Sequence, residues 1–523
     1  MQPNVLSLLP PILVLISAIT TRKLPQSIMI GLATGALIAT EFAPIKTAIL
    51  IFKHLFDQVS DSDNLYVYTF LLCIGMLIAV INHTGATNAL AASLKKKIHN
   101  AKQTEHASFL ISLILALDDY LNCLTTGHIM QPLIDSFGIA RTKLAYLIHT
   151  FAGPLVILIP ISTWAAFITS QIEQAGISSD AQENVKIAID PFYIYLRSIP
   201  CIYYAIFSVI TALFIVHQSI SYGPMKTAEQ QTKTINKNQN NTIEDTQTKN
   251  AHISDLLIPL ATLLGTVFFG MLYTGNFYLF GGNQTFIGSF QNNQDAFLVL
   301  GIASIITLLV SLAISFSKKQ LNIQEAPLIL WEGFMLMWPA VLLVVLASAF
   351  GSMLRIDLQT GQYLASSLLH TMHITYIPLI FFLVSAITGL LIGSAWGTIA
   401  LLLPIGISMA YSLVVNANTD IVIVNFIILT IGSILSGATF GDHTSPIAAS
   451  GIMAATGAGC KPLDHIKTQY LYNLPPFIGA CLAFLITGFL LSSSWPIILG
   501  ISLSIGVSTT LGITLLLNMI YNK

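Results

Sequence analysis

Charged residues are scarce in this sequence, and their scarcity excludes a water-soluble fold. Only 9% of the 523 residues are Asp, Glu, Lys or Arg, 54% are hydrophobic, and the mean hydropathy is +0.77. A soluble domain needs roughly 25% charged residues to face water. Apolar runs such as residues 109–117 and 501–517 belong to stretches long enough for a membrane helix, which needs about 20 residues. The composition therefore predicts an all-α polytopic membrane protein.

Other features that would indicate an enzyme or a nucleic-acid partner are also missing. The five cysteines are scattered without a CxxC pair, so we expect neither a disulfide framework nor a zinc site. No basic cluster indicates nucleic acid, and GAGCKP at 457–462 lacks the Ser or Thr of a phosphate-binding loop. We expect a protein that is not an enzyme and has no cofactor. A membrane enzyme or receptor-like scaffold is the least favoured class.

Apolar segments bounded by polar clusters give the candidate spans, for which we expect about 11–13 transmembrane segments. They cover residues 4–21, 25–44, 65–83, 105–119, 144–171, 192–216, 254–275, 296–316, 327–352, 373–392, 420–440, 467–491 and 496–518. The first is read as a retained helix because no basic residue precedes it. The expected organisation is peripheral helices (1–64), a first transport repeat (65–217), a linker (218–253), connecting helices (254–326), a second, inverted repeat (327–466) and C-terminal helices (467–523).

The distribution of polar and basic residues predicts a linker and an orientation. Residues 218–250 are rich in Gln, Asn, Thr and Lys and have almost nothing apolar to bury, so we expect a disordered segment. If the N-terminus lies outside, 17 of the 22 Lys and Arg residues fall on the inner side, as the positive-inside rule requires. We therefore expect a multi-pass protein of the inner (plasma) membrane whose linker and C-terminus are cytoplasmic.

Three matches between the halves indicate an internal repeat. Thr84-Gly85 and Thr360-Gly361 each follow an apolar span. Further along, the spacing of Asn122, Thr126 and Pro132 equals that of Ser394, Thr398 and Pro404. The third match is between IHTFAGP (148–154) and GDHTSP (441–446). Thr84-Gly85 falls on the lysine-rich inner side and Thr360-Gly361 on the outer side. The repeats are therefore predicted to be inverted, as in many secondary transporters.

Four stretches of the repeats predict broken helices. LDDYLNCLTTGHIMQP, HTFAGPLVILIP, GSAWGTIALLLP and SGATFGDHTSP each mix Gly, Pro and small hydroxyl residues within an apolar setting. In hydrocarbon, a broken helix survives only where it lines a protein cavity, and its freed carbonyls and half-helix ends suit a small cation. The alternative is that Gly and Pro only kink ordinary helices. Trp164 and Trp396 neighbour the breaks and are interpreted as packing residues.

Three carboxylates and three histidines lie at these breaks, and of the histidines His128 is interpreted as structural. Asp118, Asp119 and Asp442 stand within or beside them, where a charge is costly and is usually paired, neutralised or functional. Burial raises a carboxylate pKa and a nearby cation lowers it, so such a group can exchange a proton for sodium. Helix capping is the alternative role for each. His149 and His443 lie at the repeat-related breaks, where a structural hydrogen bond is the alternative to proton transfer.

These arguments give one candidate set of ion- or substrate-binding residues. It consists of Asp118, Asp119, Asn122, Thr126, His149, Ser394, Thr398, Asp442, His443 and Ser445, with a sodium ion expected at Asp442, Asp119 and Asn122. The expected partners are the sodium ion, the proton and the lipid bilayer, without nucleic acid. A homodimer is compatible with the sequence.

At these same residues the sequence resembles the NhaC-type sodium/proton antiporter family, over residues 65–215 and 325–490. DDYLNCLTTG (118–127) is similar to the family's DDYxNxLTVG signature. Further matches are PISTWAAFI (160–168), TGQYLAS (360–366), GSAWGT (393–398) and SGATFGDHTSPI (436–447). The resemblance implies membership of the wider ion-transporter superfamily, with inverted repeats, re-entrant hairpins and a site at the membrane midplane.

The sequence departs from the family pattern at two positions. His149 stands where the family usually has an aspartate in an IDSTAAP-like stretch, and Ala449 stands at the acidic position of SPISDTT. A histidine can still carry a proton, since its unperturbed pKa is about 6.5. The leading hypothesis is a secondary transporter that exchanges cytoplasmic Na⁺ for external H⁺ by alternating access. The alternative is a Na⁺- or H⁺-coupled transporter of a small organic anion or amino acid, because the resembled family includes members that exchange organic acids.

Overall fold

The computed structural model describes residues 4–95, 97–179, 186–236, 251–291, 293, 295–368, 373–417 and 421–522. The peripheral elements are η1 (Val5–Leu8), α1 (Leu9–Thr21), α2 (Leu24–Ala39), α3 (Pro44–Ser60), α12 (Gly223–Asn236), α13 (Ser254–Thr274), η3 (Tyr278–Phe280), α14 (Phe286–Gln291), α15 (Ala296–Ser317) and α23 (Trp495–Tyr521). Two short strands, β1 (Ile177–Ser178) and β2 (Ile187–Ala188), pair in parallel.

The remaining helices form two halves with the same order of elements. The first half consists of α4 (Ser62–Thr84), α5 (Ala86–Lys95), α6 (Ala101–Ile114), α7 (Asp119–Ser136), α8 (Arg141–Val156), α9 (Thr163–Gln174), α10 (Pro191–Ser198), η2 (Ile199–Cys201) and α11 (Tyr203–Gln218). The second consists of α16 (Ala326–Ile356), α17 (Thr360–Leu368), η4 (Ile374–Tyr376), α18 (Ile377–Ile392), α19 (Ala395–Ala417), α20 (Ile423–Thr444), α21 (Ala449–Ala458) and α22 (Pro462–Phe489).

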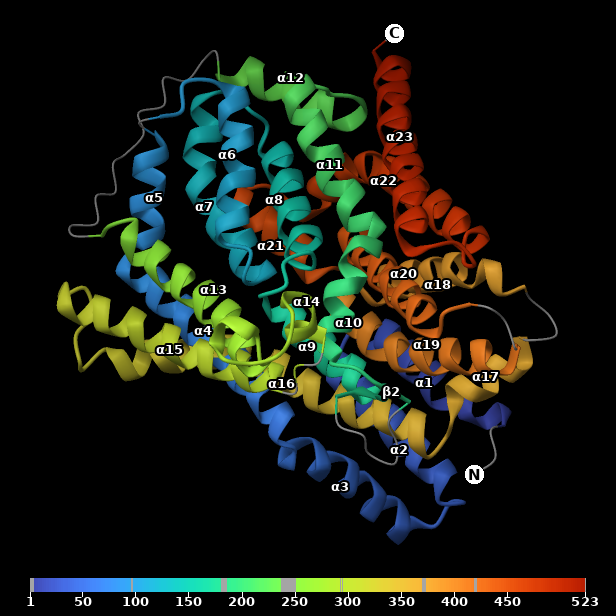
Figure 1. Ribbon diagram of the computed structural model, residues 1–523. Helices are drawn as coiled ribbons and strands as arrows, with labels where there is room; N and C mark the ends of the chain where they lie inside the picture. Colours follow the sequence, from blue (N-terminus) through green and yellow to red (C-terminus); the bar gives the residue numbers. More distant parts are fainter. Residues whose placement is uncertain are drawn as a thin grey trace.

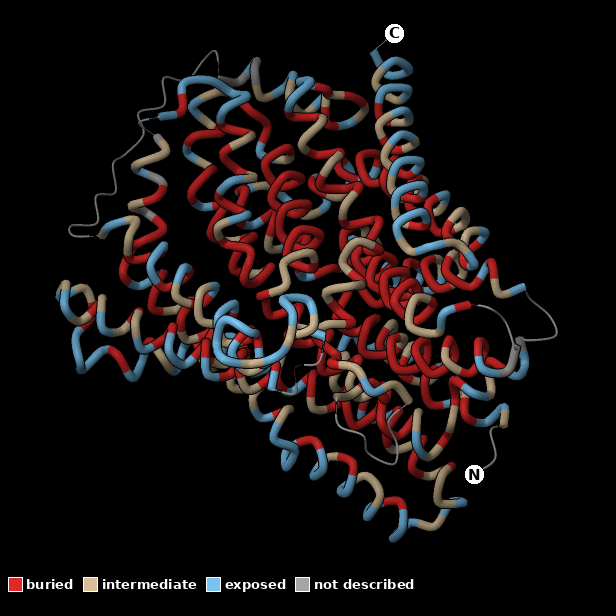
Figure 2. The backbone as a smooth tube through the Cα atoms, viewed as in Figure 1, coloured by how far each residue is buried: buried red, intermediate tan, exposed pale blue. Residues whose placement is uncertain are grey.

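Apolar length confirms the prediction of a polytopic all-α membrane protein. Among the described residues, nine helices are long and apolar enough to cross a bilayer, and a tenth span is formed if the bent pair Pro191–Cys201 and Tyr203–Gln218 is counted. Two shorter apolar helices cover Val5–Thr21 and Leu24–Ala39. Buried residues gather in the two halves, whereas α3, α15 and α23 expose much of their surface (Figure 2). The exposed apolar side chains of α15 and α23 are therefore the surface that lipid covers.

Each half contains a re-entrant hairpin, and the two hairpins enter from opposite ends. The α6–α7 hairpin turns at residues 115–118 and opens toward the end of the molecule that carries α12, whereas α18–α19 turns at Gly393-Ser394 and opens toward the end that carries α17 (Figure 1). We call these the α12 end and the α17 end. Gly393 has φ +71°, a left-handed conformation that side chains rarely adopt. The halves are therefore inverted with respect to each other.

Next to each hairpin lies a broken span. The first half is interrupted between α8 and α9 at residues 157–162, so the predicted span 144–171 is two half-helices. The second half is interrupted between α20 and α21 at residues 445–448. Ser162 begins α9 by accepting a hydrogen bond from the Ala165 backbone N–H at 3.1 Å, which satisfies one of the donors that a helix start leaves unpaired. Two of the four stretches predicted to be broken thus contain real helix ends. The other two run as continuous helices from Asp119 and from Ala395, with Pro132 and Pro404 inside them.

The structure corrects the prediction of a disordered linker for part of its length. Residues 223–236 form α12, which packs against α8 and α22, while 237–250 lie outside the described residues. Met225 is buried, and Glu229 pairs with Lys143 of α8 at 2.9 Å. The local composition is polar, but one buried apolar residue and one paired carboxylate are enough to hold α12 in place, because their partners lie on other helices.

Two further features were not predicted from the apolar segments. The span 192–216 is bent by 49° between η2 and α11, at a point that follows Pro200. Residues 44–60 form α3, whose apolar side chains Ile45, Ile49 and Phe52 are exposed. Charged and polar residues interleave with these apolar positions, so the segment lacks the continuous apolar run of a span.

Candidate functional site

Asp118 connects the tip of the first hairpin to the first broken span. One carboxylate oxygen accepts the backbone N–H of Leu121 at 3.0 Å and so caps α7, while the other accepts the Thr163 hydroxyl at 2.9 Å. The Thr163 backbone N–H also donates to the Leu117 carbonyl at 2.9 Å. Both oxygens of Asp118 are therefore engaged in holding the start of α7 against the start of α9.

Asp119 and Asp442 bring carboxylates from the two halves together. Asp119 is the first residue of α7, and Asp442 lies in the last turn of α20. Asp119 lies within electrostatic range of Asp118 and, as a smaller effect, of Asp442. Asp442 accepts the Ser450 hydroxyl at 2.5 Å, whereas Oδ1 of Asp119 is buried and has no hydrogen-bond partner among the described residues. Two buried carboxylates cannot both stay charged without a nearby cation, so the pair calls for a proton or a metal ion.

Asn122 and Thr126 bind within the first half. The Asn122 amide donates to the Ser112 carbonyl at 2.8 Å and the Phe151 carbonyl at 3.3 Å. Its own oxygen accepts the Thr126 hydroxyl at 3.0 Å. These contacts clamp α6, α7 and α8 together around the start of the hairpin. Asn122, predicted as part of the sodium site, thus has an observed role in holding three helices.

The corresponding polar residues of the second half make local contacts. The Ser394 hydroxyl accepts the Gly397 backbone N–H at 3.2 Å, and the Thr398 hydroxyl donates to the Ser394 carbonyl at 2.9 Å. The Ser445 hydroxyl donates to the Leu390 carbonyl at 2.9 Å and so ties the second break to α18. Since α7 and α19 begin directly after Asp118 and Ser394, Thr398 corresponds to Asn122. The predicted match of Asn122 with Ser394 is one helical turn out of register.

His149 lies at the centre of a buried polar cluster rather than alone. Its Nε2 is 3.1 Å from the Ser450 hydroxyl, and its Nδ1 is 3.1 Å from Nε2 of His465. The Gln469 amide also lies within 3.3 Å of Nδ1. Because Ser450 donates to Asp442, a continuous chain of hydrogen-bonding groups runs from the carboxylate pair through His149 to His465.

His443 borders this cluster, and both its ring nitrogens are engaged. Nδ1 is 2.8 Å from the Tyr204 hydroxyl, and Nε2 is 3.2 Å from the Thr150 hydroxyl. Its ring centroid is 4.6 Å from that of His149, with the planes nearly perpendicular. The His443 carbonyl accepts the side-chain amides of Gln469 and Asn473 at 2.5 and 3.0 Å. These contacts fix the end of α20 on which Asp442 stands.

Sequence reasoning missed the residues that α22 contributes. His465, Gln469 and Asn473 are buried and recur every fourth position on one face of α22. A polar stripe at helical spacing inside an apolar span was the signal that could have identified them. Ser450 was missed because a lone serine in a small-residue segment is unremarkable until the fold places it beside Asp442.

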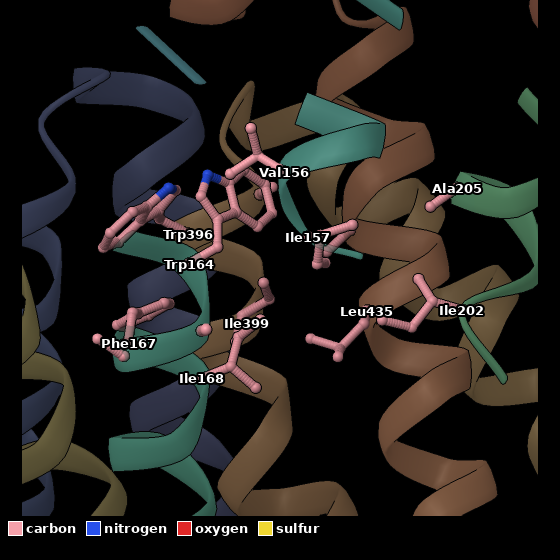
Figure 3. Close-up of a cluster of buried hydrophobic side chains, with 14 of the residues drawn as sticks. Val156, Ile157, Trp164, Phe167, Ile168, Ile202, Ala205, Trp396, Ile399 and Leu435 are labelled. Carbon is pink, nitrogen blue, oxygen red and sulfur yellow. The ribbon is translucent and has the colours of Figure 1, made fainter. Parts of the chain in front are cut away.

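An aromatic cluster joins the starts of α9 and α19. The Trp164 and Trp396 rings lie 6.0 Å apart edge to face, and Phe167 stacks on Trp396 at 4.5 Å. Figure 3 shows both indole nitrogens at the same edge of this cluster. Both nitrogens are buried. The Trp396 nitrogen has no hydrogen-bond partner among the residues that the structure describes, whereas the Trp164 nitrogen lies near the Asp119 carboxylate. The predicted packing role of the two tryptophans is observed, and the Trp396 donor remains unused.

Protein ligands alone do not form a metal centre here. Within the described ranges, no group of three or more His, Cys, Asp or Glu residues is arranged to hold a metal ion. A sodium ion at Asp119 and Asp442 would take its remaining oxygen ligands from hydroxyl or carbonyl groups, which helix breaks make available.

Comparison with known proteins shows which folds and sequences are similar. The crystal structure of the YdaH transporter of Alcanivorax borkumensis superposes with a TM-score of 0.50 at 14% identity, covering 87% of this chain and 90% of that one. An uncharacterized protein of Haemophilus influenzae is 27% identical over 494 residues, or 93% of this chain and 91% of its own. The malate-2H⁺/Na⁺-lactate antiporter of Bacillus subtilis is 27% identical over 108 residues, 21% of each chain.

The family assignment follows from a longer match. The Na⁺/H⁺ antiporter family matches residues 155–489, a range that begins in the first broken span and includes the second hairpin and second broken span. Together with the transporter fold, this match makes the protein a secondary transporter. The chain belongs to the Na⁺/H⁺ antiporter family.

Proposed function

We propose that the protein exchanges cytoplasmic Na⁺ for external H⁺ by alternating access. The observation that carries this proposal is the pairing of Asp119 and Asp442 across the two halves, with one buried oxygen of Asp119 unpartnered within the described chain. A bound sodium ion offsets the repulsion between two carboxylates, and so does a proton on either one. Sodium and protons therefore compete for the same oxygens, which is the basis of exchange.

Hydrogen bonds at the ends of the helices hold the carboxylates of the proposed site in position. Asp118 holds the starts of α7 and α9 together, and Ser450 holds Asp442 against α21. The sodium ion enters from one side and binds the Asp119–Asp442 pair. After it leaves on the other side, one carboxylate takes a proton and carries it back. Because the pair spans both halves, a movement of one half against the other changes the side from which it is reached.

We infer that the α12 end of the protein lies on the cytoplasmic side of the plasma membrane. Arg141, Lys226 and Lys467 line one cavity at this end, and Lys143 pairs with Glu229 of α12 nearby. Lys186 and Arg197 lie toward the opposite end, where they contact Ser408 and Asn425. An excess of basic residues on one side marks the cytoplasmic face of a membrane protein.

A second candidate function is the coupled transport of a small organic anion. The unused indole N–H group of Trp396 is a donor, and a carboxylate substrate accepts hydrogen bonds from such groups. The similarity of 108 residues to an antiporter of malate and lactate points the same way. In this case sodium or a proton at Asp119 and Asp442 would travel with the anion or against it.

Transport by purified protein in proteoliposomes tests both candidates. An imposed sodium gradient should drive proton movement, read by a pH-sensitive dye inside the vesicles. Asp442→Asn should abolish this flux, since an amide keeps the size of the side chain but neither carries a full charge nor releases a proton. Asp57→Asn, which changes an exposed carboxylate of α3, is the matched control and should transport like the parent.

Two outcomes decide against sodium/proton exchange at this site. An Asp442→Asn protein that exchanges sodium and protons like the parent contradicts the site. A parent that moves no sodium or protons by themselves, but exchanges labelled malate or lactate across the membrane, establishes the second candidate instead. The same vesicles serve for both measurements, so protein amount and orientation are held constant.

A further inference from the structure

Three buried histidines lie on one side of the carboxylate pair, and the exchange mechanism so far uses none of them. His149, His443 and His465 come from α8, α20 and α22, and each is at most 1% exposed. A buried polar ring is costly in a membrane protein, and such groups commonly mark proton paths. His443 is fixed at both nitrogens by Tyr204 and Thr150. His149 and His465 instead bond to each other.

We propose that His465, His149 and Ser450 form a proton relay between the cavity at the α12 end and Asp442. This inference rests on the proposed sodium/proton exchange and assigns the path by which protons reach one side of the site. His465, Ser450 and the direction of the path follow from the contacts of this structure, not from the family motifs.

The atoms of the relay are connected without a gap. Nε2 of His465 is 3.1 Å from Nδ1 of His149, Nε2 of His149 is 3.1 Å from the Ser450 hydroxyl, and that hydroxyl is 2.5 Å from Oδ2 of Asp442. All three distances lie within hydrogen-bonding range. An imidazole can accept a proton on one nitrogen and release another from the opposite nitrogen, and a hydroxyl can do the same through its single oxygen.

The transfer balances as a passage of one proton. His465 takes a proton at Nδ1 and releases one from Nε2 to Nδ1 of His149. His149 then releases its Nε2 proton to the Ser450 oxygen, and Ser450 gives its hydroxyl proton to Asp442. For a proton that leaves Asp442 toward the cavity, every step runs in reverse. Each ring ends in the other tautomer and must return before the next proton in the same direction.

The free end of the relay lies beside a large cavity. Nδ1 of His465 is buried and has no hydrogen-bond partner among the described residues. Its chain neighbours Asp464, Lys467 and Thr468 line a cavity of about 1110 Å³ at the α12 end. The Thr468 hydroxyl donates to the His465 carbonyl at 2.8 Å. His465 thus lies, in sequence, between residues that line a space large enough for water and bordered by charged side chains.

Other charged and titratable groups surround the relay from every helix packed against it. The His443 ring of α20 packs against His149, and Tyr204 of α11 bonds to His443 in turn. Cys123 of α7 and Asp442 of α20 contact Ser450. Tyr146 of α8 and Tyr472 of α22 pack on each other, and the titratable groups that line the cavity are Asp135, Arg141, Asp464, Lys467 and Lys226. Gln469 competes with His465 for Nδ1 of His149.

A pair of assays on the same proteoliposomes separates proton movement from sodium movement. Sodium-driven proton flux requires both ions to move, whereas exchange of ²²Na⁺ for unlabelled Na⁺ requires no net proton transfer. His465→Gln should lower the proton flux roughly 100-fold, at the lower end of what a positioned proton-transfer group contributes. Its ²²Na⁺ exchange should equal that of the parent, because glutamine keeps hydrogen-bonding capacity but cannot relay a proton.

Two further variants make the result decisive. His149→Gln interrupts the same chain at its next link and should give the same separation of the two assays. His128→Gln is the matched control, since His128 is an exposed histidine on α7, and it should retain both activities. Parent-like proton flux in His465→Gln and His149→Gln overturns the relay, and so does an equal loss of both activities. A parent that moves no sodium in either assay overturns the proposed exchange itself, and the relay with it.

Discussion

Gly127 is the position where α7 and α21 come closest, and its replacement should disturb the site from a distance. A Cβ atom at Gly127 would lie 2.4 Å from the carbonyl carbon and 2.5 Å from the Cα of Gly457. Small residues permit such close contacts between membrane helices. On one side of this contact α21 carries Ser450, the hydrogen-bond donor to Asp442. Gly127→Ala therefore moves the element that positions a carboxylate of the proposed site.

The size of the effect follows from the overlap. Ordinary contacts of a Cβ atom lie at 3.4–4 Å, so α7 and α21 must separate by about 1 Å, because the clashing atoms are backbone and cannot rotate away. Overpacking of this kind costs about 1–3 kcal/mol of stability. A displacement of about 1 Å at a reacting group can lower a rate roughly 100-fold. We expect Gly127→Ala to lose transport while it still inserts and folds.

The assay compares two alanine variants in the same detergent and the same vesicles. Gly153→Ala is the matched control for stability, because a Cβ atom there meets nothing within 4 Å. Replacing a glycine at a compatible position stabilises by about 0.4–1 kcal/mol, so its thermal midpoint should equal or exceed that of the parent. Gly127→Ala should have a lower midpoint and reduced sodium-driven proton flux. Parent-like flux and midpoint for Gly127→Ala would refute the argument from close contact.

Two further predictions concern groups away from the site. Lys143→Met should lower the thermal midpoint strongly, because the buried Glu105 and partly buried Glu229 carboxylates, at 2.7 and 2.9 Å from Lys143 Nζ, would lose their cation, which costs about 3–5 kcal/mol. Glu229→Gln should lower the midpoint less in the same melting assay, and equal midpoints for the two variants would contradict the pairing. Burial raises the pKa of Asp190, in the loop before α10, to about 8. The folded protein therefore holds this proton more tightly than the unfolded chain, and the resulting stabilisation is complete below the ordinary carboxyl pKa and is lost as the pH rises toward 8. Asp190→Asn should remove this pH dependence from the melting curves, and an unchanged dependence would show that another group causes it.

Much of the fold could be predicted because apolar length is a local property. The spans at 65–83, 254–275 and 296–316 correspond closely to α4, α13 and α15, and two of the four Gly- and Pro-rich stretches contain real ends of helices. The helical part of the linker could not be predicted, since Glu229 is held by Lys143 from a distant helix. Residues 395–417 form one long helix, α19, although their start was interpreted only as a break.

The candidate site was predictable where a polar or charged residue lies inside an apolar segment of the sequence. Asp119, Asp442 and His149 are polar residues in apolar surroundings, and the fold brings them into one network. Asn122 shares their surroundings but hydrogen-bonds to neighbouring backbone instead. Whether this asparagine binds an ion or holds neighbouring helices depends only on which atoms the fold places near it. His465 needed the helical phase of α22, because its sequence neighbours are charged and mark an interface rather than a buried site.

The aromatic cluster between α9 and α19 also sets a preference for the resting state of the transporter. Trp164 and Phe167 belong to the first half and Trp396 to the second, so any movement that separates the halves at this point must part both ring contacts. Aromatic pairs contribute about 0.5–1.5 kcal/mol each beyond the area they bury, and about 1–3 kcal/mol corresponds to a population ratio of about 5 to 150. Between cycles the molecule should therefore wait with its two halves in contact through these rings.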